Sequence, residues 1–163
     1  MSEYNVTHTG TIKVLEKEMK FELYGETAPK TVENFVKLVN DKFYDGIIFH
    51  RVIPGFMIQG GDPTGTGMGG SKEEIYGEFK SNGFNNPIKH VKGVMSMART
   101  MMPNSASSQI FIMHEVSPHL DGQYAAFGKV VSGLDVIDTI ANVKRNGQDK
   151  PLQDVVIESI RLD

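Results

Sequence analysis

The stretch FHRVIPGFMIQGGD, residues 49–62, is the part of the chain that decides its fold. Segments 47–53 and 56–59 both have the composition of strands, and the Pro54-Gly55 pair between them is typical of a turn. Because side chains alternate along a strand, Ile58 lies on one face of the second segment, while Met57 and Gln59 share the other. The stretch therefore predicts two adjoining strands, the second of which carries both an apolar and an amide side chain on one face.

The flanking sequence supplies further short strands and two helices. Apolar residues alternate on both sides of a turn near Glu16 and Lys17, which predicts an opening hairpin. Thr27 can cap a helix with Pro29 in its first turn, and a second helix is expected over 134–141. Other strand-like segments lie at 94–98, 109–113, 126–130 and 155–162. Many short strands with only two helices favour a mainly β fold, in which helices pack on a closed or nearly closed antiparallel sheet.

Length and composition restrict the class of protein. The chain has 163 residues, 39% of them hydrophobic and 23% charged, as expected for one globular domain spanning residues 1–163. A net charge of −3 without a basic block argues against nucleic acid or a membrane surface as a partner. The chain has no cysteine, so disulfides, thiolate catalysis and cysteine-bound metals are excluded. Without a signal-peptide pattern at its start, the protein is expected to be cytoplasmic.

The strand predicted at 109–113 has an unusual second face. Ile110 and Ile112 lie on one side, whereas Gln109, Phe111 and Met113 share the other. An antiparallel strand with a solvated face normally shows polar residues there. Large apolar groups mixed with an amide indicate a groove that binds something apolar and forms hydrogen bonds with it. The alternative is that loops or helices simply cover this face.

Four segments carry a family signature: residues 49–62, residues 107–112, residues 120–122 with 127–130, and the helix segment 28–35. In their order along the chain they resemble the cyclophilin family of peptidyl-prolyl cis-trans isomerases over nearly the whole chain. The resemblance implies a closed eight-stranded antiparallel β-barrel capped by two α-helices, with the active site on the outer surface of the barrel.

The resemblance also implies site residues. The catalytic arginine of the family matches Arg51, and the pocket residues match Phe56, Met57, Gln59, Ala98, Gln109, Phe111 and Leu120. Three positions depart from the best-known eukaryotic members and are similar to bacterial ones. His119 stands in place of a tryptophan, Tyr124 in place of a histidine, and Arg99 at the pocket wall in place of an asparagine. These substitutions predict isomerase activity with weak cyclosporin binding.

Arg51 and Gln59 suit the expected chemistry. Rotation about an amide is slow because resonance gives the C–N bond double-bond character, and no bond has to break to speed it. In the twisted transition state the proline nitrogen regains a lone pair, which a permanently charged guanidinium can stabilise. Gln59, on the adjoining strand, can hold the Arg51 guanidinium in place. No metal and no cofactor is expected.

The predicted partners are proline-containing peptides and unfolded protein chains, whose folding the protein would assist as a monomer. One rival is a binding module or holdase that uses the same groove without needing Arg51. Another is a nucleotide-dependent enzyme, since residues 65–70 satisfy G-x-G-x-x-G, but no strand and helix flank that motif. His114 and His119 are five residues apart with Pro118 between them, which argues against a helical zinc motif.

Overall fold

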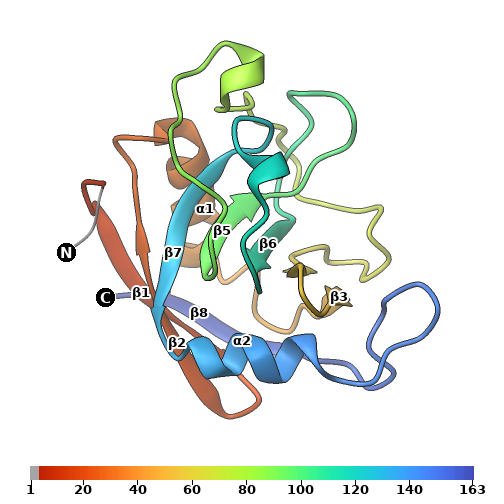
Figure 1. Cartoon of the computed structure of the whole chain (residues 1–163). Coiled ribbons are helices and arrows are strands. Elements are labelled where there is room, and N and C mark those ends of the chain that lie inside the picture. Colours follow the sequence, from red (N-terminus) through yellow and green to blue (C-terminus); the bar gives the residue numbers. More distant parts are fainter. Residues whose placement is uncertain (1–3) are drawn as a thin grey trace.

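A computed structural model describes residues 4–163 (Figure 1). The eight strands are β1 (His8–Val14), β2 (Lys17–Leu23), β3 (Phe49–Ile53), β4 (Met57–Gly60), β5 (Val94–Met97), β6 (Ile110–Met113), β7 (Ala126–Ser132) and β8 (Ile157–Leu162). Two α-helices, α1 (Pro29–Asn40) and α2 (Leu134–Ala141), and two 3-10 turns, η1 (Lys80–Asn82) and η2 (Pro118–Leu120), complete the described chain. The predicted mainly β architecture with two helices is confirmed.

All eight strands belong to one antiparallel sheet, in the order β3-β4-β6-β5-β7-β2-β1-β8. The first hairpin turns through Leu15 and Glu16, both with positive φ (54° and 62°), as a tight hairpin turn requires. The sheet curls until its two edge strands approach each other, but β3 and β8 form no continuous ladder. An isolated bridge between Ile48 and Val156 joins the edges instead. The predicted closed barrel is therefore not confirmed, and the sheet is an open, curled half-barrel.

The outer edge of β3 is nonetheless covered. The N–H of Phe49 donates to the Val155 carbonyl at 2.9 Å, and the N–H of Val52 donates to the Asp149 carbonyl at 2.8 Å. Both acceptors lie in the segment 142–156 that connects α2 to β8. This segment therefore lies along the strand that carries Arg51.

The two helices pack on different parts of the curled sheet. Helix α1 contacts β8, whereas α2 contacts β2, β3 and β4 and runs along the lower end of the sheet in Figure 1. The predicted Thr27 cap is wrong, because Ala28 occupies the cap position and no side chain next to it forms the hydrogen bond. The buried carboxylate of Glu78 accepts instead, from the N–H groups of Thr31 (2.7 Å) and Lys30 (3.2 Å). Over residues 4–163, no helix is both long and apolar enough to cross a membrane.

The apolar residues form two clusters, one on each face of the sheet. The larger cluster fills the inside of the curl and includes Phe35, Ile110 and Ile112. The smaller cluster lies on the outer face and includes Met57, Phe111, Met113 and Leu120, all of which are buried. The alternation predicted for residues 109–113 is therefore confirmed, and its second apolar face becomes the floor of the candidate site.

Candidate active site

Strands β3, β4 and β6 place the predicted residues on the outer face of the sheet. Arg51 on β3 pairs with Gln59 on β4, and Gln59 pairs in turn with Phe111 on β6. Between β3 and β4, the N–H of Phe56 donates to the Ile53 carbonyl at 3.0 Å, and Gly55 has a φ of +81°. Proline followed by a glycine with positive φ is the pattern of a type II turn. This turn sets Phe56 at the edge of the site.

These side chains surround a hollow of about 150 Å³. Its floor is apolar and buried, with Met57, Phe111 and Leu120 each less than 8% exposed, while the Arg51 side chain is exposed at its rim. A small apolar hollow with a few polar groups at its edge is the usual form of a ligand pocket. The residues that line it are Arg51, Phe56, Met57, Gln59, Ala98, Arg99, Phe111, Leu120 and Tyr124.

Two predicted site residues lie beside this hollow instead of lining it. Gln109 lines a neighbouring hollow, where its amide also meets Gln59. His119 is exposed and stacks on Phe56, with ring centroids 6.0 Å apart and planes 30° apart. The structure therefore brings together nine of the eleven predicted residues around one hollow and leaves these two at its margin.

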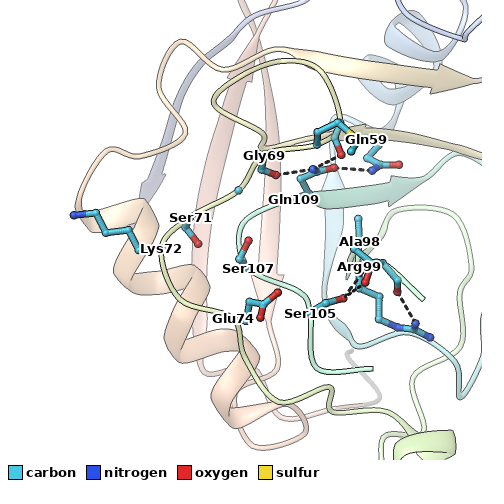
Figure 2. Close-up of a pocket in the computed structure, with 14 residues that line it drawn as sticks. Gln59, Gly69, Ser71, Lys72, Glu74, Ala98, Arg99, Ser105, Ser107 and Gln109 are labelled. Carbon is cyan, nitrogen blue, oxygen red and sulfur yellow. Dashed lines mark hydrogen bonds between the residues drawn. The ribbon is translucent and has the colours of Figure 1, made fainter. Parts of the chain in front are cut away.

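A chain of hydrogen bonds fixes the amide side chains beside Arg51 (Figure 2). Gln109 donates from Nε2 to the carbonyl oxygens of Gly69 (2.8 Å) and Gly67 (3.0 Å), so its Oε1 is free to accept from Gln59 Nε2 at 2.9 Å. Gln59 must then present its Oε1 to the guanidinium, and Arg51 Nη1 donates to it at 3.2 Å. In the described part of the chain, no carboxylate pairs with Arg51.

Arg99 forms the wall between the two hollows. Its guanidinium lies between two aromatic rings, 4.7 Å from the centroid of Phe79 and 4.6 Å from that of Tyr124. Nη1 and Nη2 donate to the carbonyl oxygens of Thr100 (2.9 Å) and Gln123 (2.6 Å). This arrangement fixes the Tyr124 ring, which in turn lies 5.7 Å from Phe111 in an edge-on contact.

The second hollow, drawn in Figure 2, has a volume of about 530 Å³ and is mainly polar. It shares Gln59, Ala98 and Arg99 with the first hollow, so the two lie side by side. Sequence analysis missed the residues of its far side. They are Gly67, Met68, Gly69, Gly70, Ser71, Lys72, Glu74, Thr100, Ser105 and Ser107. The six glycines between 60 and 70 were the signal that could have found them, since they mark a loop that folds closely against its neighbours.

The family to which the chain belongs follows from its match to a protein-family model. Residues 7–162 match the model of the family described as cyclophilin-type peptidyl-prolyl cis-trans isomerase/CLD. The chain belongs to the cyclophilin family. Its fold is also that of solved cyclophilins. A cyclophilin-type isomerase of Cryptosporidium parvum superimposes with a TM-score of 0.88 at 34% identity over 96% of this chain and 97% of that one.

Related sequences include both single cyclophilins and longer proteins. A peptidyl-prolyl cis-trans isomerase of Schizosaccharomyces pombe is 46% identical over 86% of this chain and 90% of its own length. A putative isomerase of Staphylococcus aureus is 44% identical over 94% of this chain and 93% of its own. The chain spans only 39% of a putative bifunctional phosphatase/isomerase of Streptococcus pyogenes, to which it is 41% identical over 95% of its own length.

The glycine motif at 65–70 donates backbone hydrogen bonds to a buried carboxylate. Asp62 is buried and accepts hydrogen bonds from the N–H groups of Thr64 (2.8 Å), Gly67 (2.7 Å) and Gly69 (3.0 Å). Burial raises the pKa of Asp62, but these hydrogen bonds and that from the Thr64 hydroxyl outweigh it and hold the pKa well below its ordinary value. The N–H groups that could bind a phosphate are thus already occupied, which argues against the nucleotide-dependent alternative.

A buried histidine supports the floor of the hollow. His90 stacks on Phe111 with ring centroids 6.0 Å apart, and its ring nitrogens lie 2.9 Å from Ser96 Oγ and 3.0 Å from Asp121 Oδ1. Burial lowers the pKa of His90 more than Asp121 raises it, so the ring is neutral at neutral pH. Asp121, His90 and Ser96 are connected in the same way as the aspartate, histidine and serine of a hydrolase triad. However, His90 and Ser96 are both 0% exposed. Substrate cannot reach them, and their contacts indicate a structural role.

Metal binding finds no support in the described residues. Over 4–163, no three histidine, aspartate or glutamate side chains are grouped so that they could hold an ion. His114 and His119, the two histidines of the motif at 114–119, are engaged separately. The former bonds to Gly55 and Asp138, and the latter stacks on Phe56.

Proposed function

We propose that this chain catalyses cis–trans isomerisation of Xaa-Pro peptide bonds in flexible or unfolded protein segments. The observation that most directly supports this proposal is the position of Arg51 at the rim of an apolar hollow. Gln59 holds the Arg51 guanidinium, which has no carboxylate partner among the described residues. The hollow is of a size to hold a proline ring, and the guanidinium at its rim would then lie beside the adjoining amide. A cyclophilin of C. parvum was crystallised in the presence of the dipeptide Ala-Pro, which supports a proline-containing ligand for this site.

The catalytic argument rests on the electronic change during rotation. The planar amide has a barrier of about 18–20 kcal/mol, and the reaction takes tens of seconds without a catalyst. Millisecond turnover requires an acceleration of about 10⁴–10⁵, or roughly 5.5–7 kcal/mol. At the twisted state the proline nitrogen becomes pyramidal and accepts a hydrogen bond that it cannot accept when planar. An Arg51 N–H directed at this nitrogen therefore stabilises the transition state more than the ground state.

Each part of the site has a distinct task in this mechanism. Phe56, Met57 and Phe111 would hold the proline ring and keep water from the amide, which strengthens the hydrogen bond from Arg51. The chain of amides from Gly69 through Gln109 to Gln59 would fix the guanidinium orientation before substrate binds. Because no bond breaks, the mechanism needs no nucleophile, proton transfer or cofactor.

The test is a protease-coupled isomerisation assay on a short Xaa-Pro peptide, with peptide binding followed separately by NMR line shapes. The wild-type chain should accelerate isomerisation, and Arg51→Ala should lose most of this activity while still binding the peptide. Arg161→Ala, which removes the same charge from β8 where it pairs with Asp45, is the matched control and should keep its activity. Full activity in Arg51→Ala would favour a binding module that uses the groove without a catalytic donor.

A further inference from the structure

His114 connects the turn that carries Phe56 to helix α2. It directly follows β6, and its ring lies between the β3–β4 turn and the helix. The N–H of Gly55 donates to His114 Nδ1 at 2.8 Å, and His114 Nε2 lies 3.0 Å from Asp138 Oδ1. The His114 N–H also donates to the Phe56 carbonyl at 2.8 Å. Phe56 is therefore held on both sides by one residue that does not line the hollow.

These contacts define the protonation state of the ring. A nitrogen that accepts from an N–H must carry a lone pair, so Nδ1 is unprotonated. The other nitrogen faces a carboxylate and must donate, so the proton is on Nε2. Only this neutral tautomer satisfies both neighbours. Gly55 lies in the turn between β3 and β4, outside both strands, and its N–H donates to His114 Nδ1.

We propose that His114 is a positioning residue that sets the Phe56 wall of the proline hollow, and that it does so only as the neutral Nε2–H tautomer. This inference rests on the proposed isomerase function. Protonation of Nδ1 would place two N–H groups against each other and release Gly55. The turn could then move, and Phe56 with it, so that the hollow would close less well around the proline ring.

Charged groups on three neighbouring segments lie close to the ring or to its partners. Asp138 on α2 lies against the ring, and Lys92, which precedes β5, forms an ion pair with Asp138 at 2.5 Å. Glu115, the next residue after His114, has a carboxylate oxygen close to Gly55. The His114 ring is thus connected through Asp138 to α2 and to the segment before β5.

Two substitutions test the contacts of the two ring nitrogens of His114 separately. In His114→Asn the amide oxygen takes the place of Nδ1 and can still accept from Gly55, but the shorter side chain does not reach Asp138. In His114→Gln the amide takes the place of Nε2 and can still donate to Asp138, but it leaves Gly55 N–H without its acceptor. We expect His114→Gln to raise KM about three- to tenfold with little change in kcat, since Phe56 acts on binding. His114→Asn should remain within about twofold of wild type, as should Lys92→Met, the control at the far side of Asp138.

The decisive readout is NMR of the imidazole nitrogens, recorded alongside activity as the pH is lowered. Wild-type kcat/KM should fall in step with protonation of His114, with the Gly55 amide and Phe56 ring signals shifting together, and His114→Asn should abolish this dependence. Equal effects of the Asn and Gln variants, or a ring with Nδ1 protonated in the active form, would overturn the proposal. The Gly55 and Phe56 signals need no catalysis, so failure of the isomerase proposal would appear separately, as an inactive wild type.

Discussion

Arg51 and Gln59 face each other across β3 and β4, with Arg51 Nη1 donating to Gln59 Oε1 at 3.2 Å. This contact occupies one edge of the guanidinium and leaves its other N–H groups for a substrate. The amide chain behind Gln59 limits how far the arginine can turn. The catalytic contribution of Arg51 should therefore depend on its geometry as well as its charge.

This geometry predicts that Arg51→Lys will be almost as damaging as Arg51→Ala. Loss of one preorganised donor should lower kcat by about 10²–10³-fold in the alanine variant. The lysine variant should recover less than about tenfold of this, because a flexible ammonium cannot bond to Gln59 and the proline nitrogen in fixed orientation. The measurement is kcat and KM for both variants, with peptide affinity from NMR. Near-normal turnover of the lysine variant would leave a purely electrostatic role for Arg51.

Arg99 should contribute to substrate binding more than to turnover. Its guanidinium holds Tyr124 against the hollow, and each cation–π contact contributes about 0.5–2 kcal/mol. We expect Arg99→Gln to raise KM about three- to tenfold while kcat changes less than about twofold. Steady-state kinetics on the same Xaa-Pro peptide would measure this. A loss confined to kcat would instead place Arg99 in the chemical step.

His119 should make inhibition by cyclosporin weak. A tryptophan at this position in well-known family members supplies an indole N–H and a broad apolar face, whereas imidazole offers less apolar area and becomes charged when protonated. The change His119→Trp should tighten inhibition by about tenfold or more and leave turnover nearly unaltered. Inhibition constants for the two forms would show the difference. Equal constants would mean that this exposed position does not touch the inhibitor.

Asp62 should stabilise the fold in a pH-dependent way. Its folded-state pKa lies below the value of about 3.9 expected in the unfolded chain, so its stabilisation is complete above that value. The stabilisation is lost as the pH falls through the lower, folded-state pKa. At pH 7 we expect Asp62→Asn to reduce the free energy of unfolding by about 2 kcal/mol.

Urea unfolding of wild type and Asp62→Asn at several pH values would test this prediction. The difference between the two forms should shrink below about pH 4, since the unfolded wild-type carboxylate then gains a proton first. A difference that stays constant down to about pH 2 would show that the ionised form of Asp62 is not what the loop requires.

Sequence patterns predicted those features that depend on neighbouring residues. The alternation at 109–113 indicated two different strand faces, and the structure confirms both. Helix α1 was expected, but its cap was not, because Glu78 comes from 47 residues beyond Thr31. Whether the edges of the sheet close depends on the contact between Ile48 and Val156, which no local pattern records.

The same limit applies to the candidate site. Resemblance to the family supplied the residues of the apolar hollow, and nine of them do line it. The second hollow is built from a glycine loop and serines whose spacing has no period, so it was missed. The role of His114 beside Phe56 could not be predicted, because its partners Gly55 and Asp138 are distant in sequence.

The covered edge of β3 has a consequence for the proposed action on unfolded chains. Exposed strand edges recruit other extended segments by backbone pairing, which leads to aggregation. Here the segment 142–156 already accepts the outward N–H groups of Phe49 and Val52. Under the proposed function, a client chain would therefore engage the Arg51 strand through side chains in the hollow without extending the sheet at this edge, and so would remain free to leave after each turnover.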